Sequence, residues 1–457
     1  MKAIIIAVGK GSRLWPFTEI RSKSMLAVSN IPIISWSRQA LSSCGVLEVS
    51  VLVDNHESQL VNFSRKSSQF PMPSIHVFPG EKDIVDVLLS YQLRHPISET
   101  VLIIPGDCII QAEDLQRLID SPEDNAVLLR GLRQEERSDR LCFNAKQGFK
   151  LLAHPRREGF DYEIVAYKLG AKFFNEILPY TTNIYDYVQV GMMPSDEKYL
   201  ESALVEWEKK VNVDYVFAEK PCFNIDYPWN ILEANDYLNE LRCQRVAKDE
   251  ISRTAAISPT AILRGNVQIG ANSLVGDGVI FQGNAIVGTN CKITDGAIIG
   301  ENAVIGDNVI IKEYCKVSSG STVGDGSIIG HCAELSGIIF ENTYLYHNCE
   351  ISGVLGRNVD IGAGTVFGTL RFDDAKVNHR INGKRITPQK YSELVYMGDF
   401  TRTGVNTVIM PGVKVGCRSV VGANVLLNED LPNNKIIQVE QNVSIKPWGS
   451  ERYGFNM

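Results

Sequence analysis

The chain has 457 residues, about three times a common domain length, so its length excludes a single small module. Its 46 basic residues against 53 acidic ones give a net charge of −7 without long basic runs, which argues against nucleic acid or an anionic membrane as partners. No stretch reaches the roughly 20 apolar residues that span a bilayer, so we expect a cytoplasmic protein.

The first half of the chain predicts an α/β domain over residues 1–228. Apolar, strand-like runs alternate there with helical stretches. The runs are 2–8, 46–53, 74–78 and 100–105, and the helical stretches include 33–44 and 114–119. This alternation is typical of a Rossmann-like, mostly parallel sheet with helices on both faces. The segment 229–253 keeps a helical periodicity and is rich in charge, which predicts a connecting helix.

Beyond this helix an apolar residue recurs at every sixth position, without a break at fourteen positions from Ile257 to Leu335. A spacing of six fits an all-β solenoid in which three short strands form each coil of eighteen residues. The large apolar side chain then points into a narrow core. We assign residues 254–440 to this domain, with a loop insertion at 371–403. Residues 441–457 form a C-terminal tail, which we interpret as a cap rather than the start of a further domain.

The first predicted strand runs directly into a glycine-rich turn. The candidate nucleotide-binding residues are Ala7, Val8, Gly9, Gly11, Ser12 and Arg13. At the carboxyl end of a parallel strand, the backbone N–H groups of such a turn can hold a phosphate. The spacing matches neither the G-x-G-x-x-G motif nor a P-loop. Lys23, within the segment R-S-K-S-M-L, adds a second cation shortly after the turn.

Together these segments resemble the sugar-1-phosphate nucleotidylyltransferases, whose signature is close to A-A-G-x-G-T-R-L-x-P-x-T followed by R-P-K-P-M-L. The resemblance implies that the chain joins a nucleoside triphosphate to a sugar-1-phosphate and releases pyrophosphate, with Arg13 and Lys23 as catalytic residues. A sugar-1-phosphate is already an anionic nucleophile. The reaction therefore requires alignment and charge neutralisation rather than a general base.

Two further segments resemble the metal-binding part of that family. Asp107 follows an apolar strand, at the carboxyl edge where open α/β sheets bind ligands. In the family the corresponding Gly-Asp aspartate holds the catalytic divalent ion. The segment F-N-I-D-Y-P-W resembles the one that completes the site, with Asn224 as the expected ligand and Asp226 in reserve. Both carry oxygen ligands suited to Mg²⁺, which is therefore the expected cofactor, whereas a simple turn role for Asn224 is the alternative.

Two regions depart from the family pattern. Where relatives have a glycine loop close to the base, this chain has larger side chains at 81–87. The sugar-pocket motifs E-K-P and N-A-G have no clear match, since residues 154–156 and 162–167 occupy that stretch. The resemblance therefore names neither the base nor the sugar. It leaves open a catalytically weakened subunit that binds sugar nucleotides or regulates a partner.

The solenoid resembles the left-handed parallel β-helix of hexapeptide-repeat acyltransferases, and the two-domain layout resembles enzymes that also acetylate amino-sugar-1-phosphates. The resemblance implies a homotrimer near 3 × 50.7 = 152.1 kDa. In that family a histidine before the G-A-G-T segment is the base of acetyl transfer, which makes His347 the candidate. The spacing from His347 to the G-A-G-T segment is one residue shorter than in the family, and Thr369 stands where the family has asparagine. We expect no appreciable acetyl transfer and a solenoid that serves mainly in assembly.

Overall fold

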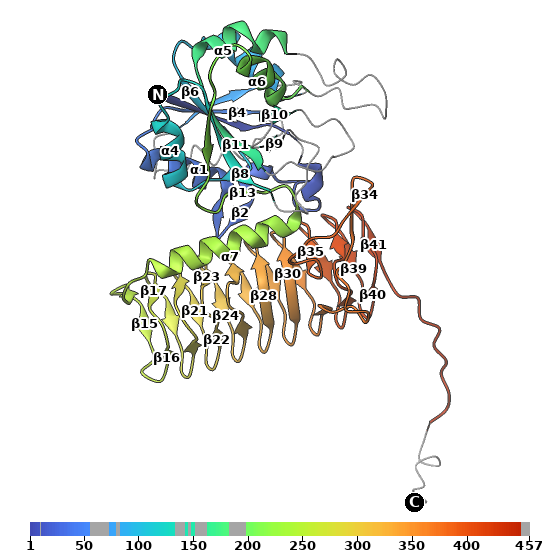
Figure 1. The fold of residues 1–457 in the computed structure, drawn as a ribbon. Helices are drawn as coiled ribbons and strands as arrows, with labels where there is room; N and C mark the ends of the chain where they lie inside the picture. Colours follow the sequence, from blue (N-terminus) through green and yellow to red (C-terminus); the bar gives the residue numbers. More distant parts are fainter. Residues whose placement is uncertain are drawn as a thin grey trace, which may run out of the picture.

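The computed structural model describes residues 1–9, 11–54, 73–78, 83–132, 142–144, 148–150, 162–181 and 198–448. An α/β domain is joined by one long helix to an elongated stack of short parallel strands (Figure 1). The predicted fold class, an α/β domain followed by a hexapeptide β-helix, is thus confirmed. In the described ranges no helix is long and apolar enough to cross a membrane.

The N-terminal domain is built on one sheet with the strand order β10-β9-β11-β6-β1-β4-β5. In addition, β8 pairs with β11, and β12 pairs with β8. The strands are β1 (Lys2–Ala7), β4 (Val49–Val53), β5 (Ser74–Val77), β6 (Val101–Pro105), β8 (Ala126–Gly131), β9 (Cys142–Asn144), β10 (Gly148–Lys150), β11 (Tyr162–Leu169) and β12 (Asp214–Phe217). Pairing of β1 with both β4 and β6 is parallel, as predicted. By contrast, β11 runs antiparallel to β6 and β8, a reversal that the alternation of strands and helices did not predict.

Helices cover both faces of this sheet. They are α1 (Ile33–Ser43), α3 (Ile84–Arg94), α4 (Ala112–Asp120), α5 (Ala171–Glu176) and α6 (Leu200–Glu208). Because successive side chains of a strand point to opposite faces, β1 contributes to two separate cores. Ile4 and Ile6 pack with residues of α3 and α6, whereas Ala3 and Ile5 pack with residues of α1 and α4.

The β-helix extends from β14 (Glu250–Ile251) to β41 (Ile436–Ile437). Its parallel pairs join residues eighteen positions apart, for example Val275 with Ile293. Twelve of the fourteen predicted core positions, from Ile269 to Leu335, are buried, and the first two, at the open end of the stack, are partly buried. The coil of eighteen residues that the spacing predicted is therefore present.

The coils depart from this register in three regions, the last of which is the step of sixteen residues from Val420 to Ile436. Between β26 (Thr322–Val323) and β28 (Glu334–Ile339) the pairing advances by sixteen residues, since Thr322 pairs with Ile338. Further on, Asp360 pairs with Arg402, 42 residues later, because a long excursion leaves the coil in between. The chain rejoins the ladder at β35 (Val395–Met397), before the predicted end of the insertion at residue 403.

The connecting helix, α7 (Pro228–Gln244), lies along the side of the β-helix (Figure 1). It ends before the predicted residue 253. Residues 250–251 instead form β14, whose backbone pairs in parallel with β17 (Val267–Ile269) rather than continuing the helix. The first paired strand of the β-helix thus precedes the predicted start at residue 254.

Two fully buried asparagines of α7 join the domains. The Asn235 side chain accepts hydrogen bonds from the Ser29 backbone N–H (3.0 Å) and the Thr322 hydroxyl (2.8 Å). It also donates to the Gly320 carbonyl oxygen at 3.0 Å, and Asn239 donates to the same oxygen at 2.9 Å. Because buried amides need such partners, these contacts fix the register between α7 and the coils.

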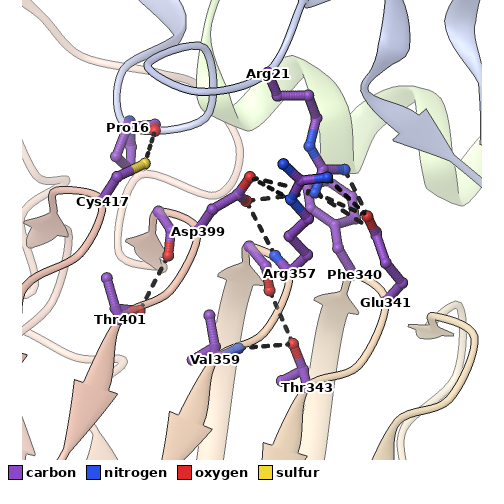
Figure 2. Close-up of polar contacts among 12 residues, drawn as sticks. Pro16, Arg21, Phe340, Glu341, Thr343, Arg357, Val359, Asp399, Thr401 and Cys417 are labelled. Carbon is purple, nitrogen blue, oxygen red and sulfur yellow. Dashed lines mark hydrogen bonds and ion pairs between the residues drawn. The ribbon is translucent and has the colours of Figure 1, made fainter. Parts of the chain in front are cut away.

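An apolar contact joins the loop after the glycine turn to the β-helix. The Phe17 ring lies edge-to-face with Phe340 and Tyr396, with ring centroids 6.0 and 6.4 Å apart. All three rings are buried in one apolar cluster that contains residues of both domains. The Cys417 thiol also donates a hydrogen bond to the Pro16 carbonyl oxygen at 3.2 Å (Figure 2).

A charge network with a buried centre lies beside the Phe340 ring (Figure 2). The Arg21 guanidinium is 3.4 Å from the Asp399 carboxylate and 3.3 Å from Glu341, and it covers the face of the Phe340 ring. Arg357, from the neighbouring coil, lies 3.2 Å from Asp399. Asp399 is only 1% exposed and therefore depends on these two cations for its compensation.

The excursion forms a hairpin of β33 (His379–Ile381) and β34 (Lys384–Ile386) that is anchored by His379. The buried imidazole donates from Nε2 to the Ser392 carbonyl oxygen at 2.8 Å, which leaves Nδ1 to accept from Lys414 at 3.4 Å. The ring also lies 5.1 Å from the Trp229 ring, measured between centroids. Burial, and then the Lys414 charge, lower the pKa of His379 from 6.5 to about 4.

This anchor predicts a loss of stability in mild acid. The unfolded chain takes up a proton on His379 near pH 6.5, whereas the folded chain resists it down to about pH 4. The free energy of unfolding should therefore fall as the pH drops through this window, by about 3 kcal/mol at most from this group. Urea unfolding of wild type and His379→Gln at pH 7 and pH 4.5 checks it. An equal fall in both proteins would remove His379 as the cause.

Candidate active site

The glycine turn after β1 is fixed by its own backbone. Gly9 and Gly11 have φ angles of 116° and 58°, the left-handed region that favours glycine. Gly11 begins a short 3-10 helix, η1 (Ser12–Leu14), and its carbonyl oxygen accepts a hydrogen bond from the Thr18 hydroxyl at 2.7 Å. This turn therefore presents Ser12 and Arg13 at the carboxyl end of the central strand.

The two segments predicted to hold a metal lie side by side. Asp107 immediately precedes β7 (Cys108–Ile109), which pairs antiparallel with β13 (Phe223–Asn224). The backbone N–H of Ile225 donates to the Asp107 carbonyl oxygen at 3.0 Å. This short ladder brings Asp107 and Asn224 together from distant parts of the sequence.

Lys23 joins the two carboxylates of this region. Its ammonium group forms ion pairs with Asp107 and, at 2.8 Å, with Asp226. Arg13 lies 3.3 Å from the other oxygen of Asp226. Lys23, Asp107 and Asp226 are each less than one fifth exposed, so water screens their charges only partly. Asp226, the reserve metal ligand, is thus engaged by both predicted catalytic cations.

Asn224 offers an oxygen with no partner. Its side chain is 8% exposed, and its amide nitrogen donates to Glu163 at 3.5 Å. Within the described part of the chain, the buried Oδ1 atom has no hydrogen-bond partner. Leaving such an oxygen unpaired is costly, and a hard divalent cation is a ligand that it suits. Asp107 and Asn224 thus bring a carboxylate and a carboxamide oxygen to neighbouring positions on the wall of one cleft.

A buried ion pair that the sequence analysis missed supports Asn224. Arg130, on β8, donates from Nε to Glu163, on β11, at 2.8 Å. Both side chains are buried, and Glu163 in turn accepts from Asn224. The available signal was charge within largely apolar strands: Arg130 in β8, and Glu163 together with Lys168 in β11. Such a residue is expensive to bury without a partner, which points to a local role.

A cleft of about 610 Å³ unites these groups. The predicted site residues that line it are Val8, Gly9, Gly11, Ser12, Arg13, Lys23, Asp107, Asn224 and Asp226. Ala7 differs from them, because its side chain packs into the core on the α1 face of the sheet. The structure therefore gathers the catalytic and metal candidates around one opening.

The segments that depart from the family pattern are described in part. Asp83 begins α3, where it accepts hydrogen bonds from the backbone N–H groups of Asp86 (2.9 Å) and Lys198 (3.1 Å). It lines the cleft, as do Ile164 and Tyr167 of β11. Residues 81–82 and 154–156 lie outside the described residues.

His347 does not line this cleft. It lies in the β-helix, at an exposed corner between β29 (Tyr344–Leu345) and β30 (Glu350–Leu355). Its carbonyl oxygen accepts a hydrogen bond from Gly364 at 3.1 Å, so its backbone adjoins the G-A-G-T segment. Its imidazole has no hydrogen-bond partner among the described residues. Thr369 lies on an exposed loop that also carries the fully exposed Phe372.

Comparisons with known proteins agree with this organisation. A family model described as nucleotidyl transferase matches residues 2–138, and one described as bacterial transferase hexapeptide matches residues 302–337. A bifunctional protein GlmU of Methanococcus maripaludis is 31% identical over 448 residues, which cover 96% of this chain and 97% of that protein. A bifunctional sugar-1-phosphate nucleotidylyltransferase/acetyltransferase of Sulfurisphaera tokodaii is 24% identical over 445 residues, covering 96% and 100%.

The similarity to GlmU extends over both domains and nearly the full length of each chain. It confirms the resemblance drawn from the glycine turn and the sixfold repeat. The chain therefore belongs to the GlmU family of nucleotidyltransferases with a hexapeptide-repeat domain.

Proposed function

We propose that this enzyme joins a nucleoside triphosphate to a sugar-1-phosphate, forming an NDP-sugar and pyrophosphate. The observation that carries the proposal is the cluster of Lys23, Arg13, Asp107 and Asn224 around the cleft beside the glycine turn. Pyrophosphate release from a panel of triphosphates and sugar-1-phosphates tests it. Nucleotide binding without turnover on any pair would favour the alternative, a weakened binding or regulatory subunit.

In the proposed reaction the sugar phosphate oxygen attacks the α-phosphorus, and pyrophosphate leaves with the bonding electrons. The N–H groups of the glycine turn and Arg13 hold the triphosphate. Lys23 offsets negative charge where the two anions approach. No side chain has to remove a proton, because the nucleophile is already ionised.

We propose Mg²⁺ as the metal, and the family to which the chain belongs generally uses a divalent ion. The orphaned Oδ1 of Asn224 and the Asp107 carboxylate are hard oxygen donors that fit such an ion. When bound, the ion neutralises charge on the reacting phosphates. Glu163 and Arg130 hold the Asn224 amide in place, and Asp226 organises the two cations.

Arg13→Ala should lower turnover by about a hundredfold or more. The variant loses the guanidinium that stabilises the phosphate charge in the transition state, a contribution of roughly 3 kcal/mol. Steady-state pyrophosphate release measures the effect, and Arg245→Ala, at the exposed end of α7, serves as the matched control. Equal rates for wild type and Arg13→Ala would mean that the backbone amides alone bind the phosphates.

The name of the Sulfurisphaera tokodaii relative includes a second activity, acetyl transfer, and we propose that this chain lacks it. An effective base needs orientation by a hydrogen-bonded partner, and the His347 ring has none among the described residues. We expect no thiol release from acetyl-CoA that depends on glucosamine-1-phosphate or galactosamine-1-phosphate. Thiol release with either amino sugar, lost in His347→Ala, would restore the bifunctional interpretation.

The β-helix is proposed to act in assembly. Hexapeptide repeats support oligomer formation, and we propose a homotrimer that associates through this domain. We also propose that the enzyme works in the cytoplasm, where its nucleotide substrates are found.

A further inference from the structure

A second cavity adjoins the glycine turn on the side that faces the β-helix. Its volume is about 700 Å³. Residues of both domains line it. The N-terminal domain contributes the glycine turn, Arg21 and Lys23, and the β33–β34 hairpin contributes Arg380, Ile381 and Asn382. The hairpin therefore closes one wall of a space that begins at the proposed phosphate-binding turn.

Direct contacts hold this hairpin against the turn. The Asn382 side-chain amide donates to the Ser12 hydroxyl at 3.2 Å. Ile381 is buried in the apolar cluster that also contains Leu14, directly after Arg13.

The charges around the cavity differ in their existing partners. Arg21 is buried against Asp399, and Lys23 is paired with Asp107 and Asp226. Arg380, by contrast, is exposed at the wall of the cavity. Two acidic residues, Glu19 and Asp54, also line it. A wall that has both positive and negative side chains suits a polyphosphate with a bound divalent cation. The positive side chain can bind the phosphates, and the carboxylates can bind the cation together with the phosphates.

The two cavities meet at the turn. Gly9, Ser12, Lys23 and Asp54 line both of them. The metal candidates Asp107 and Asn224 line only the cleft of the α/β domain, where the proposed reaction at the α-phosphate takes place. Phosphates beyond the α position then have a path along the turn toward the hairpin.

We infer that Arg380 and Asn382 of the β-helix hairpin bind the pyrophosphate end of the nucleotide, so that the second domain contributes to the nucleotidyl site. This inference rests on the proposed function. When the bond from the sugar phosphate oxygen to the α-phosphorus forms, the bond between the α-phosphorus and the bridging oxygen breaks. The leaving pyrophosphate keeps the electron pair. Arg380 is a planar, permanently charged donor suited to that anion.

Arg380→Ala tests this role against a closely matched control. Arg385 lies directly opposite Arg380 in the hairpin ladder and carries the same charge, but it lines neither of the two cavities. Calorimetric titration of the full chain with Mg²⁺-pyrophosphate should give about tenfold weaker binding for Arg380→Ala and wild-type binding for Arg385→Ala. In the reverse reaction, KM for pyrophosphate should rise by a similar factor while KM for the NDP-sugar stays unchanged.

The titration needs no turnover, so it separates failure of this inference from failure of the proposed function. Equal effects of the two substitutions would reduce the role of Arg380 to general charge and overturn the inference. Unchanged pyrophosphate binding in Arg380→Ala would overturn it as well. A parallel titration with orthophosphate shows whether the cavity prefers pyrophosphate or binds any free phosphate. If orthophosphate binds as tightly and with the same dependence on Arg380, the cavity is a free-phosphate site rather than a leaving-group site.

Discussion

Asp107→Ala should abolish metal-dependent turnover while leaving the fold intact. Asp107 is the carboxylate of the proposed metal site and Asn224 its neutral oxygen, so the variant would keep only the weaker of the two proposed ligands. It would also release Lys23 from one of its ion pairs. We expect a loss of about a thousandfold or more, roughly 4 kcal/mol of transition-state stabilisation.

The assay for Asp107 is pyrophosphate release over a range of Mg²⁺ concentrations, with circular dichroism to confirm folding. Asp120→Ala, at the exposed end of α4, removes the same charge away from the cleft and should keep the wild-type rate. A wild-type rate for Asp107→Ala in Mg²⁺ would remove Asp107 from the site.

Asp399→Ala should cause the largest loss of stability. The substitution leaves Arg21 without its buried carboxylate partner and removes one partner of Arg357 (Figure 2). Breaking a buried ion pair by removing one partner costs about 3–5 kcal/mol, and here Arg21 would keep only the partly exposed Glu341 as a partner. Without Asp399, the loop that carries both Arg21 and Lys23 should be held less firmly against the β-helix. Turnover should therefore fall as well.

An exposed ion pair of the same β-helix provides the control. Asp360 pairs with Arg402 at 3.3 Å, and the two side chains are 40% and 70% exposed. Asp360→Ala should change the free energy of unfolding by at most about 1 kcal/mol. Urea unfolding monitored by tryptophan fluorescence compares the variants. If Asp399→Ala and Asp360→Ala are equally stable, the buried network does not hold the domains together.

The β-helix could be predicted from the sequence because each coil repeats the same local requirement. One apolar residue in six is enough to fill a narrow core. Ile269 in an early coil and Leu335 in a later one therefore follow the same sequence pattern and are both buried in that core. The glycine turn and Asp107 were predictable for a related reason. Both follow apolar strands directly, and the carboxyl ends of parallel strands meet at one edge.

Contacts between distant segments could not be predicted in this way. Arg130 and Glu163 lie in separate strands, and nothing local in the sequence indicates that they pair. The contact of Asn382 with Ser12 depends on how a β-helix excursion folds back onto the other domain. The antiparallel direction of β11 likewise depends on the topology of the whole sheet rather than on its own apolar pattern.

The most direct test of the proposed activity measures both products of one reaction. Wild-type protein is incubated with each pair of triphosphate and sugar-1-phosphate, with Mg²⁺ or with EDTA, and NDP-sugar is quantified by mass spectrometry beside released pyrophosphate. We expect at least one pair to give equal amounts of the two products, and only with the metal. Pyrophosphate without NDP-sugar, turnover that persists in EDTA, or nucleotide binding with no turnover on any pair would contradict it.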